Sequence, residues 1–435
     1  MVEQSKNLLD NQQVALDFLH GAARLMVTYN TRTYLLQRHL NRIAQAIGLD
    51  NLSMDIGYCR VTLFTKQGTI LYAYTPEFCI NIAFLAKVMH IIDKVCAHTL
   101  SPREGLLAFE TIERTAENRQ WSLAALFSAA AASAIAFLAK GDISTMVAVG
   151  FAAAGSIMVQ KYLTHKQIIK LMLPFAGSFF GAIFCSFWIR MGWTTTPNVC
   201  LIVPVLLMIP GPHLINGLYD IVENNIQTGI ARLCLAASIV IASSCGVLLG
   251  SHLMFLESTT PILHDTVVGE LPLWLDAVMA GVTSCGFAAF YNAPWRVLVI
   301  SSLYGMMGHA IRYFLLDSGY SLESSTFFAC LAVGFFANFM AEYLRIAFSA
   351  VAFASAMPMM PGMLMFSAIN HATSIATYGQ QAEPVLVVLM LSELFKSTLV
   401  LGAMVAGLLI GACFARIFAE GLDRPLHQIK RQFRM

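Results

Sequence analysis

Two apolar segments of the chain carry polar and ionisable side chains immediately after a Pro-Gly sequence. The segments are VPVLLMIPGPHLINGLYD and SAVAFASAMPMMPGMLMFSAINHAT. The side chains are His213, Asn216 and Asp220 in the first segment and Ser367, Asn370 and His371 in the second. Such groups can bind the charged ends of a small solute or carry a proton. An ionised side chain at the centre of a bilayer costs about 2.5–3.5 kcal/mol, so it indicates a functional site.

Each Pro-Gly sequence is predicted to break a membrane helix into two halves. Proline removes a backbone donor and glycine loosens a helix. Unwound backbone at membrane depth is tolerated only inside protein or beside a water-filled cavity. The N-terminus of each second half-helix would offer free N–H groups and a positive dipole end to a carboxylate. The break residues are Pro210, Gly211, Pro212, Pro358, Pro361 and Gly362.

An alternative explanation gives the residues after the breaks no binding role. The Pro-Gly sequences would then only end short tilted spans, and Asp220 and Glu223 would be solvated loop residues. Glu393 and Lys396 form a further ionisable pair, at positions i and i+3 of an apolar run. The two side chains could neutralise each other on one helix face, or they could couple transport to a proton or to the substrate.

The composition of the chain is that of a polytopic membrane protein. Its 435 residues are 57% hydrophobic and 12% charged, against about 25% charged in soluble domains, and the mean hydropathy is +0.67. A net charge of +2 without a basic stripe argues against nucleic acid as a partner. The ten cysteines stand singly, so we expect no metal site. We expect no cofactor, and the absence of Walker A, GxSxG and HExxH motifs argues against an enzyme.

The chain divides into a polar N-terminal part and an apolar remainder. Residues 1–119 have the pattern of an α+β domain that we expect to be cytosolic. Its predicted elements are a helix over 14–49, a hairpin over 54–74 with its turn at 66–68, a helix over 78–99, and a helix from Pro102 to about 120 with a capping box at Ser101 and Glu104. The remainder is predicted to comprise five-span repeats over 120–257 and 272–416 and a basic cytosolic tail over 417–435.

We predict a mainly α fold with ten membrane spans. A span needs about 20 residues. Eight apolar runs satisfy this alone, and two shorter runs satisfy it only when joined across a break. The eight runs are 121–139, 143–160, 171–189, 229–256, 273–291, 295–315, 323–341 and 384–415, and the two broken spans contain 199–209 and 346–357.

The spans recur with a constant offset. Gly362 follows Gly211 by 151 residues (362 − 211), and the same shift carries four segment starts in the first half close to starts in the second. A duplication explains this, and five spans per copy would invert the second copy. Loop 161–170 and the tail after Phe414 are basic, whereas loop 257–272 is acidic, as the positive-inside rule requires. We therefore expect a multi-pass protein of the cell inner (plasma) membrane with both termini cytoplasmic.

The sequence around each break resembles the threonine/serine exporter family. LLMIPGPHLINGLYDIVENNIQTGIARL is similar to the first-half motif of that family, and AMPMMPGMLMFSAI to its second-half signature. The matching positions are Pro210, Gly211, Leu214, Ile215, Asn216, Asp220, Thr228, Gly229 and Arg232. His213 stands where the family often has proline, and Thr28-Tyr29-Asn30-Thr31 where it has Gly-Ala-Glu-Thr or Ser. The resemblance is to the fused form; related systems split the halves, including a pair that exports succinate.

This resemblance implies efflux of threonine, serine or another small amino acid, or of a small dicarboxylate, driven by the proton gradient. Our hypothesis is a secondary active exporter that works by alternating access. Its partners would be the substrate, protons and the lipid bilayer, with a homo-oligomer as a further possibility. Alternatives are a channel, a membrane scaffold for the N-terminal domain, or an intramembrane hydrolase that uses Asp220 and Glu393.

The residues of this hypothesis have the following expected roles. The substrate carboxylate binds beside Gly211 and Gly362, and the polar groups of the substrate form hydrogen bonds with Asn216 and Asn370. Asp220 binds the substrate ammonium or carries the coupling proton, together with His213 or His371. The full substrate-binding set is Gly211, His213, Asn216, Asp220, Gly362, Ser367, Asn370 and His371, and the coupling candidates are Asp220, Glu393 and Lys396.

Overall fold

The computed structural model contains two compact units. It describes residues 2–49, 52–65, 68, 70–75, 80–114, 121–254, 271–344 and 348–432. The first unit comprises Met1–Arg119, Asn216–Cys234 and Tyr291–Pro294, and the second comprises Gln120–Ile215, Leu235–Phe290 and Trp295–Met435. Two segments of the apolar region therefore belong with the N-terminal domain.

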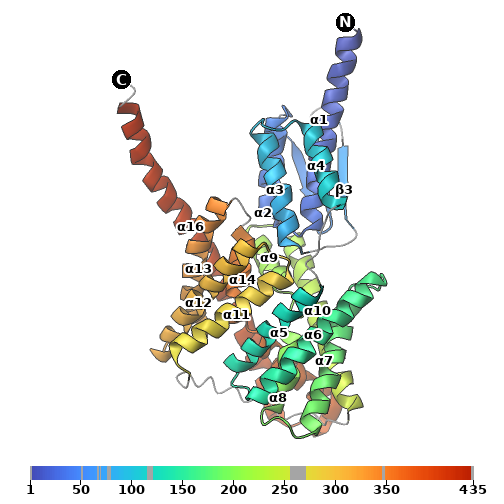
Figure 1. The fold of residues 1–435 in the computed structure, drawn as a ribbon, viewed down its shortest axis with the longest axis vertical. Helices are drawn as coiled ribbons and strands as arrows, with labels where there is room; N and C mark the ends of the chain where they lie inside the picture. The colour runs from blue at the N-terminus through green and yellow to red at the C-terminus, as the bar shows by residue number, and fades with distance from the viewer. Residues whose placement is uncertain are drawn as a thin grey trace. The chain divides into compact units, whose positions relative to one another are not determined.

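The N-terminal part of the first unit is a small α+β fold (Figure 1). Its three antiparallel strands lie in the order β1-β2-β3, and α1 packs against β2 and β3. The elements are α1 (Val2–Thr28), α2 (Thr33–Ala46), β1 (Ser53–Ile56), β2 (Arg60–Phe64), β3 (Ile70–Tyr74), α3 (Ile82–Cys96) and α4 (Pro102–Arg114).

Two elements that the sequence predicts as continuous in this domain are divided in the structure. The helix predicted over 14–49 is two helices, because Asn30 adopts a left-handed conformation with φ +56° between them. The first half of the predicted hairpin is two strands, since Gly57 N–H donates to Arg60 O and turns the chain. Strands β2 and β3 pair as predicted, while Lys66 and Gln67 of the predicted turn lie outside the described residues.

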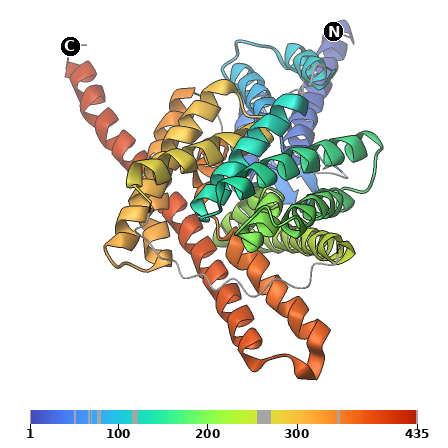
Figure 2. The same cartoon turned by 60° about the horizontal axis from the view of Figure 1, so that its bottom comes forward.

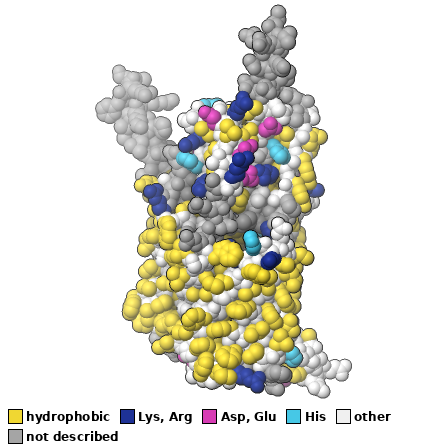
Figure 3. All heavy atoms as spheres, turned by 45° about the vertical axis from the view of Figure 1, so that its right-hand side comes forward, with side chains coloured by type: hydrophobic (Ala, Val, Ile, Leu, Met, Phe, Trp, Pro, Cys, Tyr) yellow, Lys and Arg dark blue, Asp and Glu magenta, His cyan; other side chains and the backbone are white. Residues whose placement is uncertain are grey.

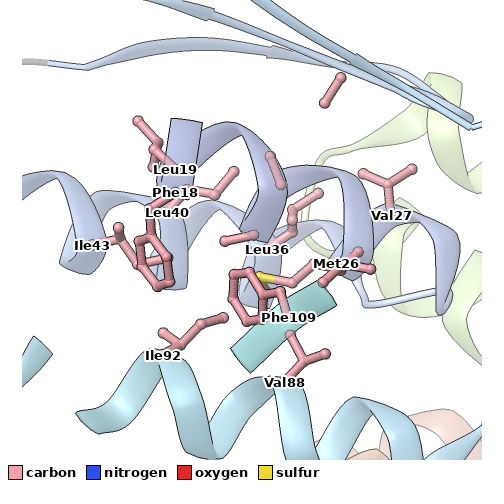
Figure 4. Packing of buried hydrophobic residues seen from close by; sticks show 14 of the residues in the cluster. Phe18, Leu19, Met26, Val27, Leu36, Leu40, Ile43, Val88, Ile92 and Phe109 are labelled. Carbon is pink, nitrogen blue, oxygen red and sulfur yellow. The ribbon is translucent and has the colours of Figure 1, made fainter. Parts of the chain in front are cut away.

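A hydrophobic core joins the helices and the sheet of this domain (Figure 4). Phe18 on α1 stacks on Phe109 of α4 with ring centroids 5.0 Å apart. Leu40 on α2 and Ile92 on α3 are completely buried in the same cluster. Each such side chain contributes about 1.5–3 kcal/mol when fully buried, so the cluster fixes the helices that carry the corner between α1 and α2.

The predicted capping box at the start of α4 is confirmed. Ser101 N–H donates to Glu104 Oε2 at 2.8 Å, and Glu104 N–H donates back to Ser101 Oγ at 3.3 Å. The hydrogen bonds from Ser101 hold the pKa of the Glu104 carboxyl below its usual value. Pro102 occupies the first helical position, where its missing N–H costs nothing.

The described residues from Trp121 onward are mainly helical (Figures 1 and 2). Apart from Asn216–Cys234 and Tyr291–Pro294, this part of the chain belongs to the second unit. Helix α9 ends in the first unit, and helix α10 begins there. The helices are α5 (Trp121–Leu138), α6 (Ile143–His165), α7 (Met172–Arg190), α8 (Pro197–Leu206), α9 (Gly211–Val222), α10 (Ile226–Leu253), α11 (Leu273–Phe290), α12 (Trp295–Asp317), α13 (Leu322–Leu344), α14 (Phe348–Ala356), η1 (Met357–Met359), α15 (Gly362–Tyr378), η2 (Gly379–Gln381) and α16 (Pro384–Gln432).

The helical region has the features of a multi-pass membrane protein. Seven helices of the described chain are long and apolar enough to cross a membrane, and nine spans result if each bent helix pair is one span. The predicted tenth span, α12, is a 23-residue helix outside this set, because His309 and Arg312 make it less apolar. Hydrophobic side chains dominate the surface of this region on the face that Figure 3 shows.

Helices and turns in the two halves match in length and position. Helices α11 and α12 begin 152 residues after α5 and α6 (273 − 121 and 295 − 143) and end 152 residues after them (290 − 138 and 317 − 165). The left-handed turn residues Lys140 and Asn292 have the same separation, as do Gln167 and Gly319. The acidic loop 257–272 lies almost wholly outside the described residues, as do the side chains of the basic tail from 420 onward.

Asp142 caps α6 and also ties down the loop before α8. Its Oδ1 accepts from Thr145 N–H at 2.6 Å, and its Oδ2 accepts from the N–H and the hydroxyl of Thr195, each at 2.6 Å. Partial burial alone would raise the pKa of this carboxyl, but the hydrogen bonds from Thr195 and Thr145 outweigh it and lower the pKa. The carboxylate therefore stabilises the fold at neutral pH, and this stabilisation is lost only when the pH falls below the usual range of an Asp.

Replacing Asp142 with Ala is expected to destabilise the purified protein by about 1–2 kcal/mol, the usual cost of losing a helix N-cap. Thermal unfolding in detergent checks this as a lower Tm. Asp317→Ala is the matched control, because Asp317 is exposed at the C-terminal end of α12. Equal Tm values for the two variants would contradict the capping role.

Candidate functional site

Both Pro-Gly sequences break a helix in the same way. Helices α8 and α9 meet at 62°, and the pair formed by α14 with η1 and α15 meets at 57°. At the first break Gly211 N–H donates to Ile209 O at 2.8 Å, and at the second Gly362 N–H donates to Met360 O at 2.8 Å. Because 360 − 209 and 362 − 211 both equal 151, the predicted offset holds at the breaks.

The two breaks pack against each other's first half-helix within the second unit. A Cβ on Gly211 would lie 2.8 Å from Phe353 and 3.0 Å from Met357 Sδ, in α14 and η1. A Cβ on Gly362 would lie 3.2 Å from Leu206 of α8 and would overlap Ile209. Gly211 thus contacts the second broken span as Gly362 contacts the first. Both breaks are buried, so neither lies at a lipid-facing surface.

The backbone N–H groups at the two second half-helices differ. At the start of α9, His213 and Leu214 N–H both donate to Pro210 O, and Pro212 has no N–H. These groups are already used, contrary to the expectation that both helix starts are free. At the start of α15, Met363 and Leu364 donate to no carbonyl of the described backbone. The start of α15 is therefore the better anion site.

Three polar side chains form a buried cluster on α15 and α16. Ser367 Oγ donates to Glu393 Oε1 at 2.7 Å, and His371 Nδ1 lies 2.8 Å from Glu393 Oε2. His371 is 2% exposed and Glu393 is 8% exposed. Since a carboxylate only accepts hydrogen bonds, Glu393 holds the imidazole in the tautomer with hydrogen on Nδ1. His371 Nε2 is buried and has no hydrogen-bond partner among the residues that the structure describes.

Three other predicted site residues of the second unit, Lys396, Asn370 and His213, lie outside the Ser367–His371–Glu393 cluster. Glu393 pairs with His371, and among the described residues it forms no ion pair with Lys396, whose side chain is exposed. The alternative in which Glu393 and Lys396 neutralise each other on one helix face is therefore wrong. Asn370 is half-buried on α15, and His213 is buried on α9.

Asp220 belongs to the first unit and is held there by a buried ion pair. Its Oδ2 lies 2.7 Å from Arg232 Nη1, and its Oδ1 accepts from Thr33 N–H at 3.1 Å. Arg232 Nη2 also donates to Thr31 O at 2.9 Å. Asp220 is 0% exposed and Arg232 is 3% exposed, so the interpretation of Asp220 as a solvated loop residue is wrong.

The corner between α1 and α2 makes further contacts with this part of α9. Asn216 Nδ2 donates to Asn30 O at 3.2 Å. Arg32 lies 3.2 Å from Glu223 and stacks over the ring of Tyr219 at 4.7 Å. The sequence analysis placed Arg232 on a family motif. It identified neither Arg232 nor Thr33 as a partner of Asp220, nor Arg32 as the partner of Glu223. The Thr-Gly-x-x-Arg motif itself was the available signal for Arg232.

A second histidine–carboxylate pair joins α11 and α12, and sequence reasoning missed it. His309 Nδ1 lies 2.5 Å from Asp276 Oδ2, and both side chains are largely buried. No group of three His, Cys, Asp or Glu side chains suited to a metal ion occurs in the described parts of the chain.

Two family models match this chain, one in each half. Residues 17–254 match the threonine/serine exporter model ThrE. Residues 276–414 match a second model, described as Threonine/Serine exporter, ThrE. No solved structure matches the chain. The matched ranges include both broken helix pairs and the Ser367–His371–Glu393 cluster. The chain therefore belongs to the threonine/serine exporter family.

Proposed function

We propose that this protein is a proton-coupled secondary exporter of threonine or serine that works by alternating access in the inner membrane. The family implies a threonine or serine substrate and a transporter, not an enzyme. The proposal adds the coupling, the mechanism and an arrangement of ten spans, with α12 as the tenth. Both termini are cytoplasmic in this arrangement.

The reciprocal packing of the two breaks carries this proposal. Gly211 contacts Met357, and Gly362 contacts Leu206; adding 151 to 206 gives 357. Exchanging the two halves of the chain therefore turns one of these contacts into the other. A two-fold axis that relates the two copies would produce this correspondence. Since each copy contains an odd number of spans in the proposed arrangement, that relation would invert one copy. Paired broken helices in inverted repeats are typical of transporter binding sites.

The proposed substrate site lies on the second half-helices within the second unit. The substrate carboxylate binds the free N–H groups of Met363 and Leu364 beside Gly362. Ser367, Asn370 and His371 follow on the same helix. From α9, Gly211 and His213 complete the set. Glu393 and His371 form the proposed coupling pair, because Glu393 is a buried carboxylate bonded to His371 and to Ser367. The side chain of Lys396 is exposed, so its role in coupling is smaller than that of Glu393.

Asn216 and Asp220 have a positioning role in this proposal. Both side chains bind the corner between α1 and α2 or its partner Arg232. The carboxylate of Asp220 already accepts hydrogen bonds at both oxygens. Asp220 therefore fixes the C-terminal part of α9, and the coupling proton is assigned to the second half of the chain.

Counterflow in proteoliposomes tests the proposal. Vesicles that contain the purified chain and an excess of unlabelled solute are diluted into labelled solute, for a panel of small amino acids and dicarboxylates. We expect transient accumulation of labelled threonine and serine with matched internal solute. Equilibration without accumulation would instead indicate a channel, and an absence of flux for every solute would contradict the proposed function. Loss of uphill export on addition of an uncoupler checks the coupling.

A further inference from the structure

We propose that His371 Nε2 is the single atom for which the substrate ammonium and the coupling proton compete. This inference rests on the proposed function and names the group that links its two fluxes. The atom is buried and has no hydrogen-bond partner in the described parts of the chain, while both oxygens of Glu393 are bonded to other members of the cluster. It lies on the second half of a broken span, nine residues after the break glycine (371 − 362).

The hydrogen bonds of the cluster determine what Nε2 can bind. Glu393 accepts from Ser367 Oγ at one oxygen and from His371 Nδ1 at the other. With hydrogen on Nδ1, Nε2 carries a lone pair and acts as an acceptor. A free amino acid supplies one strong cationic donor, its ammonium group. The negative charge of Glu393 favours that cation over a second carboxylate, so the cluster selects the ammonium end of a zwitterion.

A proton occupies the same lone pair when it binds His371. The protonated imidazole donates from both nitrogens and repels an ammonium group, so the two cations exclude each other. Binding of threonine from the cytoplasmic side would then release one proton, and binding of a proton from the outer side would release threonine. Because the zwitterion carries no net charge, each cycle would move one positive charge inward as one threonine leaves.

The equivalent position in the first half cannot perform this exchange. Asp220 lies nine residues after Gly211 (220 − 211), and its partner is Arg232. A guanidinium remains charged at all physiological pH values, so this pair holds its protons fixed. Asp220 and His371 thus occupy matching positions (371 − 220 = 151), but only the imidazole has a nitrogen lone pair that can take up a proton and release it again.

Few other ionisable groups lie on the elements packed against His371. Helix α16 contributes Glu393 and the exposed Lys396, and α8 contributes the buried Cys200. The other ionisable side chains in the described part of α16, Cys413 and Arg416, lie 20 (413 − 393) and 23 (416 − 393) residues after Glu393 along the helix. Helix η2 contributes none, and α15 itself carries Tyr378 at its C-terminal end. His213 on the other second half-helix is the remaining imidazole of the proposed substrate site. His371 is the one whose Nδ1 bonds to a carboxylate.

Proton release by the full-length wild-type protein is the direct test. Threonine is added to purified protein in weakly buffered detergent solution with a pH indicator, at a series of pH values from 5 to 8. We expect up to one proton released per threonine bound, and an apparent Kd for threonine that rises about tenfold per pH unit on the acid side, as linkage between two competing ligands requires. Threonine binding without proton release at any pH would overturn the inference.

The variant His371→Gln supplies the second measurement. A glutamine oxygen can accept from the ammonium but takes up no proton, so we expect threonine exchange to persist, with a flat pH dependence and no uphill export. His309→Gln is the matched control, because His309 forms the other histidine–carboxylate pair, and it should keep the wild-type pH dependence. An unchanged acid dependence in His371→Gln would overturn the inference. If that variant does not fold, the wild-type proton release decides.

These outcomes separate the inference from the proposed function. Wild-type protein that exports threonine but binds it without releasing protons keeps the proposed function and loses the inference. Wild-type protein that moves no threonine in counterflow loses the proposed function itself.

Discussion

Asp220→Asn is expected to abolish export and to destabilise the protein by about 3–5 kcal/mol. The substitution leaves the Arg232 guanidinium, 3% exposed, without its counter-charge. Removing one partner of a buried ion pair has this cost because the other charge stays desolvated. The pair also joins the end of α9 to the start of α10 and to Thr33, so its loss would release the half-helix that carries the first break.

Thermal unfolding in detergent and threonine export from proteoliposomes measure the two effects separately. Asp55→Asn is the matched control, since Asp55 is exposed on β1 of the same unit. The double variant Asp220→Asn with Arg232→Gln removes both charges, and we expect it to regain part of the stability without regaining export. Normal Tm and normal export in Asp220→Asn would contradict both the ion-pair energetics and the positioning role.

Gly411→Leu is expected to disrupt the packing of α13 on α16. A Cβ at this position would overlap the carbonyl oxygen of Leu331 and lie 2.8 Å from Phe335 N. Both are backbone atoms of α13, so no side-chain rotation can relieve the overlap. Small residues allow membrane helices to approach this closely, and overpacking a well-packed interface costs about 1–3 kcal/mol or more.

Helix α16 provides its own control for this substitution. Gly402→Leu places the same side chain nine residues earlier on the same helix, where a Cβ would meet nothing within 4 Å. We expect a clearly lower Tm and a loss of export for Gly411→Leu, because α16 also carries Glu393, and near wild-type values for Gly402→Leu. Equal stability of the two variants would show that α13 and α16 separate easily.

The sequence alone determined the class of the protein and the positions of its broken helices. Apolar runs of membrane length are a local property, and proline and glycine act on the backbone of their own segment. The Pro-Gly sequences and their 151-residue offset therefore located both breaks, and the capping box at Ser101 located the start of α4. The hydropathy pattern could not find the division of the first predicted strand, because that division depends on the single turn at Gly57.

The partners of the ionisable residues depend on tertiary packing and could not be predicted from the sequence. Glu393 has Lys396 one turn away on its own helix, yet it bonds to Ser367 and His371 on α15. Asp220 meets Arg232 on α10 and Thr33, 187 residues earlier in the chain. A sequence reports which groups could ionise and which neighbours lie along one helix face. The partner that a buried charge adopts is the one that compensates its desolvation, and that choice depends on how distant helices pack.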